Sequence, residues 1–197
     1  MSDWDSYEAL LTEGYRQCAK LTWRYGTTYY WGAALLPKPQ RKHVHAIYAL
    51  CRLADDIVDL PSGQEPGLNA DSISVEPEPT VPDAQPLSFG SGERRGSGTS
   101  TGSASSVRAR LETFADQFRT SLAERGSTDP VMAAVVHTVL ACRMPAEYFD
   151  RFFGAMAMDL TTISYETWED LRTYMEGSAA VIGEMMLPVL EPTSPAA

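Results

Sequence analysis

Three aspartates within five residues of an otherwise apolar stretch constrain this chain more than any other feature. They are Asp55, Asp56 and Asp59, in the run ALCRLADDIVD. On a helix, at 100° per residue, Tyr48, Arg52, Asp55 and Asp59 fall within about 60° of one another. Apolar residues occupy much of the opposite side. The run therefore predicts a helix with a core-facing back and an acidic front.

The spacing of the acids suggests a metal site. Asp55 and Asp59 are one helical turn apart, so their carboxylates repel each other unless a cation neutralises them. Magnesium commonly takes one or two protein carboxylates and completes its octahedron with water and phosphate oxygens. Arg52, one turn upstream, could bind an anionic ligand that is coordinated to such an ion. Two plainer interpretations stay open: a solvated face of an amphipathic helix, and an ordinary i,i+4 ion pair between Arg52 and Asp56.

Charge and cysteine content narrow the function classes. The chain has 197 residues, enough for one domain, and a formal net charge of -10. Nucleic-acid binding is not expected, because no basic stripe is present. Cys18, Cys51 and Cys142 form no CxxC pair, and neither a disulfide framework nor a zinc site is indicated. With no apolar signal core near the N-terminus, we expect a reducing, cytoplasmic setting. Peripheral contact with a membrane stays open.

The periodic segments are helical, and no convincing alternating strand appears. Pro130 follows Asp129, a plausible N-cap, and Thr167 stands three residues before Asp170 as in a capping box. The predicted fold class is all-α, with the whole of 1–197 in one domain. Helices are expected at 5–21, 39–60, 107–125, 130–142, 145–160 and 167–190.

Residues 61–106 differ from the rest in composition. Half of these positions are Gly, Pro or Ser, and large apolar residues are few. Burying six large apolar side chains yields roughly 10–18 kcal/mol, whereas ordering the backbone costs on the order of 50–90 kcal/mol. We therefore predict a disordered insertion at the C-terminal end of the acidic helix.

Two further segments are candidate binding elements. On the helix expected at 167–190, Tyr174, Ser178 and Val181 share one side, and small residues make the helix thin. The pattern is equally compatible with two explanations: an isoprenoid chain approaches this side closely, or a neighbouring helix does. Upstream, Gly26, Thr27 and Thr28 could present backbone N–H and hydroxyl donors to an anion.

Two long stretches resemble the squalene/phytoene synthase family, bacterial phytoene synthases in particular. They are YGTTYYWGAALLPKPQRKHVHAIYALCRLADDIVD at 25–59 and MAMDLTTISYETWEDLRTYMEGSAAVIGEMMLPVL at 156–190. The resemblance covers nearly all of the chain outside 61–106. It implies an isoprenoid-synthase helical bundle with a central cavity. The implied reaction joins two geranylgeranyl diphosphates head to head to give phytoene, a step of carotenoid biosynthesis.

By this resemblance, Asp55, Asp56 and Asp59 hold Mg²⁺, or Mn²⁺ in its place, against a prenyl diphosphate. Arg52 contacts the diphosphate, and Tyr48 lines the cavity. Tyr174 matches a tyrosine near the reacting centre, and the small-residue wall behind it includes Ser178 and Val181. Gly26, Thr27 and Thr28 fall where the family has a short turn near the diphosphate.

One departure from the family pattern is large. The family carries a second DxxxD motif on a later helix, and this chain contains no match to it. We therefore expect the N-terminal part of such an enzyme, with C-terminal helices missing: a truncated product, a fragment, or one subunit that needs a second chain to supply the motif. The alternatives are a squalene or dehydrosqualene synthase-like enzyme and a non-catalytic helical assembly or binding homologue.

Overall fold

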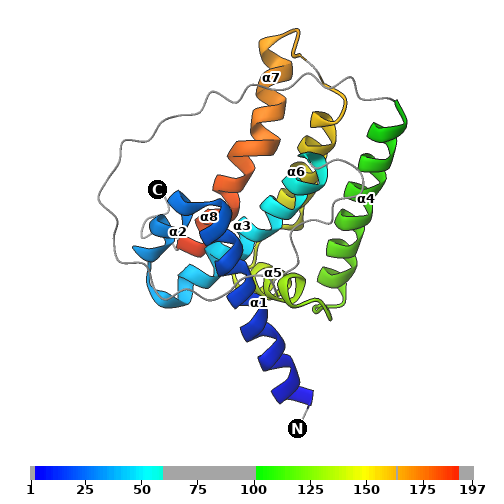
Figure 1. Ribbon diagram of the computed structural model, residues 1–197. Helices are drawn as coiled ribbons and strands as arrows, with labels where there is room; N and C mark the ends of the chain where they lie inside the picture. Colours follow the sequence, from blue (N-terminus) through cyan, green and yellow to red (C-terminus); the bar gives the residue numbers. More distant parts are fainter. Residues whose placement is uncertain (1–2, 60–100, 163, 191–197) are drawn as a thin grey trace.

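A computed structural model describes residues 3–59, 101–162 and 164–190, and every regular element in these ranges is helical. The all-α prediction is confirmed (Figure 1). In chain order the helices are α1 (Asp3–Tyr25), α2 (Thr27–Ala34), α3 (Lys38–Asp59), α4 (Thr101–Ala123), α5 (Pro130–Ala141), α6 (Ala146–Asp159), α7 (Trp168–Met175), the π-helical turn η2 (Glu176–Ala180) and α8 (Val181–Leu190).

The acidic helix α3 is the centre of the bundle. It packs against α1, α2, α4, α5, α6 and α8. Its back is buried as the sequence pattern predicts, with Ala46, Ala49 and Ala54 completely inaccessible to solvent. Because α3 contacts nearly every other helix, the packing of the core fixes the orientation of its acidic face.

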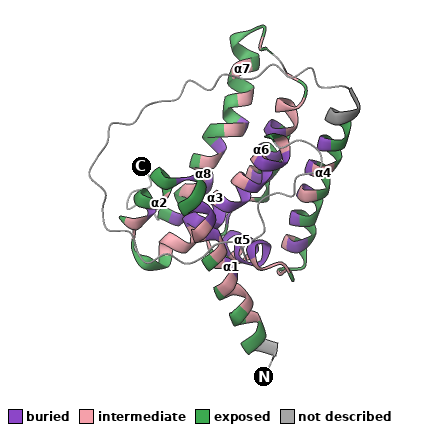
Figure 2. Cartoon of the chain, viewed as in Figure 1, coloured by how far each residue is buried: buried purple, intermediate pink, exposed green. Residues whose placement is uncertain are grey.

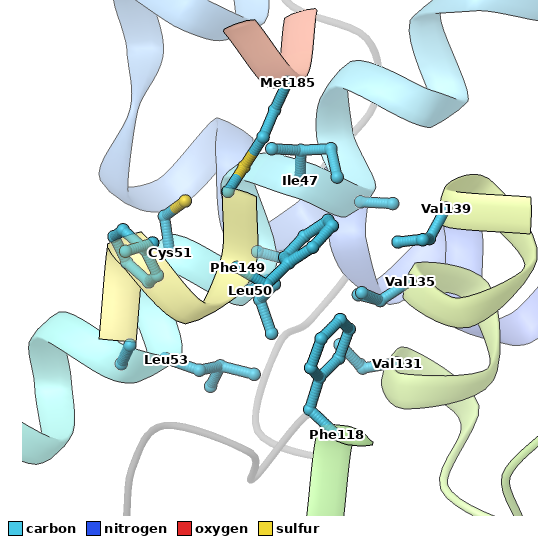
Figure 3. Packing of buried hydrophobic residues seen from close by; sticks show 14 of the residues in the cluster. Ile47, Leu50, Cys51, Leu53, Phe118, Val131, Val135, Val139, Phe149 and Met185 are labelled. Carbon is cyan, nitrogen blue, oxygen red and sulfur yellow. The ribbon is translucent and has the colours of Figure 1, made fainter. Parts of the chain in front are cut away.

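The core brings side chains of α1, α2, α3, α4, α5, α6 and α8 into one cluster, part of which is drawn in Figure 3. Leu50 of α3 and Phe149 of α6 lie at its middle, and Met185 reaches it from α8. Phe118 of α4 contacts Phe149, with ring centroids 4.8 Å apart. Truncating such a fully buried side chain to alanine costs about 2–5 kcal/mol. The phenylalanine-rich helix expected at 145–160 is α6, and its Phe149, Phe152 and Phe153 are buried in this core. None of the helices that the structure describes, α6 included, is long and apolar enough to cross a membrane.

Helix starts follow the expected capping chemistry. The Asp129 side chain accepts a hydrogen bond of 2.7 Å from the backbone N–H of Met132. At the start of α7, Thr167 and Asp170 form a reciprocal capping box. Each cap satisfies backbone donors that a helix leaves unpaired, and each contributes about 1 kcal/mol.

Three expectations about the elements need correction. The segment 27–34 is a helix, α2, and not an open turn. A helix of eight residues that is rich in aromatic side chains is not predicted from helix propensity, and α2 is stabilised by the packing of Ala33 in the core. Helix α4 begins at Thr101, six residues before the start expected at 107. The rest of the predicted insertion lies outside the described residues.

The third correction concerns the last helix, expected to be continuous over 167–190. It is interrupted at its middle by η2, a π-helical turn that adds a residue to the local repeat. In Figure 1 it appears as one column that runs from α7 through η2 to α8, beside α6 and α3.

Candidate active site

A cavity of about 260 Å³ lies in front of the acidic helix. Three elements contribute to it, and most of its wall is apolar. Tyr48, Arg52 and Asp55, three of the four residues predicted to share the acidic face of α3, line this space. The other lining residues are Tyr29 from α2; Val44, Ile47 and Cys51 from α3; and Ile182 and Met186 from α8.

Asp55 is the most perturbed acid of the site. Burial raises its pKa from the usual 3.8 to about 6, and the charge of Asp59 is the next cause. Arg52 opposes this rise, while Asp56 and Asp159 add to it. The repulsion expected between carboxylates one turn apart is therefore present in the fold.

Asp56 takes a different position from the other two acids. It is 4% exposed, and its carboxylate accepts a charge-assisted hydrogen bond from Arg52 Nη2. The i,i+4 ion pair that the sequence left as an alternative is thus formed. No group of three potential metal-ligating side chains is assembled among the described residues. Asp55 and Asp59 are left as the pair on the front of the helix, with Asp56 turned to the arginine.

Arg52 is held on two sides. Besides the pair with Asp56, its guanidinium lies over the ring of Tyr25, 4.7 Å from the centroid. Its Nε is a buried donor with no hydrogen-bond partner in the described parts of the chain. A buried donor without an acceptor costs about 1–3 kcal/mol.

The predicted donor segment lies at the start of α2. Gly26 is the N-cap residue, and the exposed Thr27 and Thr28 begin the helix. The role of Gly26 in the fold is close packing, because an added Cβ would come within 2.4 Å of Tyr48 Cζ. None of the three lines the cavity, whereas Tyr29, the next residue along, does.

The π-helical turn decides which residues of the last helix reach the cavity. Helical spacing predicts Tyr174, Ser178 and Val181 on one face, but Val181 is completely buried in the core. One extra residue in the turn rotates everything after it, so Ile182 takes the position expected for Val181, and Met186 lines the cavity one turn further along. Gly177, the second residue of η2, lies against α6, where an added Cβ would meet the Ala155 Cβ at 2.9 Å. At Gly177 the close approach is thus made by a neighbouring helix.

Tyr174 and Asp159 form a polar contact near the acidic face. The Tyr174 hydroxyl donates a hydrogen bond of 2.7 Å to Asp159 Oδ2. Burial, followed by this hydrogen bond, raises the pKa of Tyr174 to about 12, while Ser178 bonds to the same hydroxyl and opposes the shift. The Asp159 charge also acts on Asp55. Asp159, at the end of α6, therefore belongs to the electrostatic environment of the site.

Known proteins are similar to this chain over most of its length. Residues 23–197 match the profile of the family described as squalene/phytoene synthase. The chain belongs to this family. It is 27% identical over 183 residues to the 15-cis-phytoene synthase of Synechococcus elongatus, and 29% identical over 182 residues to phytoene synthase 1, chloroplastic, of Arabidopsis thaliana. These alignments cover 92% of this chain but 46% and 33% of the relatives.

Solved structures share the fold. Squalene synthase HpnC from Alicyclobacillus acidocaldarius superposes with a TM-score of 0.65 at 22% identity, covering 94% of this chain and 54% of that one. A dehydrosqualene synthase in complex with a ligand gives a TM-score of 0.62 at 19% identity, covering 95% and 50%. The expected isoprenoid-synthase fold is confirmed, and the chain spans about half of each of these structures.

Within this family fold, the sequence missed several cavity residues. Tyr29 was hidden in a helix that propensity does not predict, and Ile182 and Met186 were displaced by the π-helical turn. The signal for Asp159 was present, since it shares a helix side with Tyr148 and Phe152 and stands fifteen residues before Tyr174 in the matched stretch. Only the folded chain shows that the two meet.

Proposed function

We propose that this chain forms the first diphosphate-binding half of a prenyltransferase of the phytoene synthase type. The observation that carries the proposal is Asp55, an acid with a pKa raised to about 6 beside Asp59, at the edge of an apolar cavity. Relatives named phytoene synthase support the reaction class. The substrate is a prenyl diphosphate, with geranylgeranyl diphosphate as the first choice.

The residues present fit a magnesium ion that arrives with its substrate. Two carboxylates one turn apart are enough for Mg²⁺ when phosphate oxygens and water supply the other ligands. The absence of a three-residue ligand group in the described ranges fits weak binding of the metal alone. Bound Mg²⁺ would neutralise the diphosphate as it leaves the prenyl carbon. Asp55 and Asp59 would hold it, with Mn²⁺ as a substitute.

The chain's own side chains have distinct tasks in this proposal. Arg52, fixed by Asp56 and Tyr25, lines the cavity and would contact a diphosphate oxygen there. Apolar side chains of α3 and α8 exclude water from the allylic cation. Tyr174 keeps its proton at neutral pH and directs it to Asp159. The remaining wall, with a second Asp-rich segment, would come from the part of the family domain that this chain does not span.

Ligand-dependent stabilisation tests the proposal. We expect geranylgeranyl thiodiphosphate, a substrate analogue that resists ionisation, to raise the melting temperature in the presence of Mg²⁺ and much less with EDTA. Asp55→Asn should abolish the shift, whereas Asp116→Asn, on the exposed side of α4, should leave it unchanged. No shift under any condition would favour the non-catalytic assembly or binding homologue.

A product assay separates the enzyme classes. The chain would be assayed alone and together with the C-terminal half of a family member. Phytoene formed from geranylgeranyl diphosphate without NADPH would support the proposal. A reduced product that appears only with NADPH would instead support a squalene synthase-like enzyme.

A further inference from the structure

The end of α1 is fixed against the front of α3. The backbone N–H of Gly26 donates a hydrogen bond of 2.8 Å to Thr22 O, and the completely buried Thr22 side chain donates one of 2.9 Å to Cys18 O. An added Cβ at Gly26 would come within 2.5 Å of the Tyr48 hydroxyl oxygen. The backbone that follows α1 therefore lies directly on a residue that lines the cavity. Tyr25, the last residue of α1, is held beside the cavity by this packing.

The ring of Tyr25 contacts two arginines. The guanidinium carbon of Arg52 lies over this ring, 4.7 Å from the centroid, and that of Arg24 lies 5.3 Å from it. Each contact is attractive, because the face of an aromatic ring carries negative partial charge. The two guanidiniums repel each other, however, and an anion bound to both would remove that repulsion. One ring therefore joins two positive charges that come from α1 and α3.

Two contacts hold Arg52 from opposite directions. A guanidinium donates hydrogen bonds from its edge and contacts aromatic rings through its face. One edge nitrogen, Nη2, bonds to the carboxylate of Asp56, which is 4% exposed and so lies on the core side. Tyr25 is 39% exposed and holds the group on the solvent side. Without the ring, only the contact on the core side would remain. Tyr25 therefore keeps Arg52 at the wall of the cavity, which it lines.

Arg24 has no acidic partner among the described residues. It is exposed, and none of the ion pairs formed within the described ranges includes it. Arg119 on α4, also exposed, pairs instead with Asp116 and Asp150. Figure 2 shows much of α2, which follows Arg24 in the chain, in the exposed colour. The charge of Arg24 is therefore open to a ligand that enters from solvent.

We propose that Arg24 and Arg52 bind the diphosphate of the substrate together, and that Tyr25 is the positioning residue that holds both. The inference rests on the proposed function, to which it adds a second cation and the ring that aligns the pair. A diphosphate has enough oxygens to accept hydrogen bonds from two guanidiniums, and the planar fork of arginine matches phosphate geometry. The acids at the front of α3 repel a free anion, so cations beside them make an essential contribution to its affinity.

Calorimetry with geranylgeranyl thiodiphosphate in the presence of Mg²⁺ tests the proposal. Tyr25→Leu keeps an apolar side chain but removes the ring, and should weaken binding of the analogue about 5- to 10-fold. Tyr25→Phe keeps the ring and should bind as the wild type does. Arg24→Gln should weaken binding about fivefold. The control Lys20→Gln, which removes the same charge from α1 one turn earlier, should leave the affinity unchanged.

A double-mutant cycle shows whether the ring acts through the arginine. In an Arg52→Gln background, Tyr25→Leu should weaken binding only about twofold. Additive effects in this cycle, wild-type affinity in Tyr25→Leu or Arg24→Gln, or weakened binding in Tyr25→Phe would overturn the inference and leave the proposed function standing. Failure of the wild type itself to bind the analogue with Mg²⁺ would overturn both.

Discussion

The hydroxyl of Tyr174 lies 2.7 Å from Oδ2 of Asp159 and so joins α7 to the end of α6. We expect this contact to be energetically specific. In a double-mutant cycle of Tyr174→Phe and Asp159→Ala, the coupling free energy of unfolding should be about 1 kcal/mol, typical of a partly buried hydrogen bond to a charged group. Urea denaturation of the four proteins measures it. Strictly additive effects would show that the contact does not form in solution.

Asp55 should destabilise the protein when no metal is bound. Its folded-state pKa, about 6, is above the usual 3.8, so the folded chain binds more protons than the unfolded chain between these values. The contribution of Asp55 to the free energy of unfolding is fully present below pH 4 and is lost as the pH rises through 6. Asp55→Asn should therefore stabilise the metal-free protein at pH 7.5 by on the order of 1 kcal/mol, after allowance for solvent screening. The gain should vanish at pH 4; an equal gain at both pH values would contradict this account.

His43 should make the stability of the protein depend on pH with the opposite sign. Burial lowers its pKa from 6.5 to about 4, with Lys42 and His137 as further causes. Its Nδ1 lies 2.9 Å from Thr138 Oγ1, in a cluster that Tyr15 shares. Because the unfolded chain binds more protons between pH 6.5 and 4, stability from His43 is complete above pH 6.5 and falls as the pH drops toward 4. In the His43→Gln variant, this change in the free energy of unfolding, on the order of 1 kcal/mol between pH 6.5 and pH 4, should be absent. Denaturation at several pH values measures it.

The packing of the π-helical turn can be tested with two glycines of the same column. At Gly177 an added Cβ would meet Arg151 O at 3.0 Å and Ala155 Cβ at 2.9 Å, whereas at Gly183 it would meet nothing within 4 Å. Gly177→Ala should cost about 1–3 kcal/mol through overpacking. Gly183→Ala should instead stabilise by about 0.5–1 kcal/mol, because glycine is a poor helix former. Thermal unfolding compares the two, and equal effects would contradict the packing described for η2.

Sequence reasoning succeeded where a regular period governs the structure. The apolar back of α3 places Tyr48, Arg52 and Asp55 together at the cavity, as the 100° repeat predicts. The caps at Asp129 and Thr167 were readable for the same reason, since they depend on neighbours close in the chain.

It failed where tertiary packing overrides local pattern. Helix α2 exists because Ala33 is buried against the core, and η2 rotates Val181 inward without a signal in the apolar repeat. Asp56, expected with the metal-binding acids, turns to Arg52, and the sequence offered that ion pair only as an alternative.

The most direct test of the proposed site is calorimetry of Mg²⁺ and geranylgeranyl thiodiphosphate with the wild type and Asp55→Asn/Asp59→Asn. We predict that the wild type binds Mg²⁺ weakly alone and at least tenfold more tightly with the analogue, because phosphate oxygens must complete the coordination. The double variant should lose this coupling. Tight Mg²⁺ binding without the analogue, or coupling that survives in the double variant, would contradict the central claim that these two carboxylates hold the metal against a prenyl diphosphate.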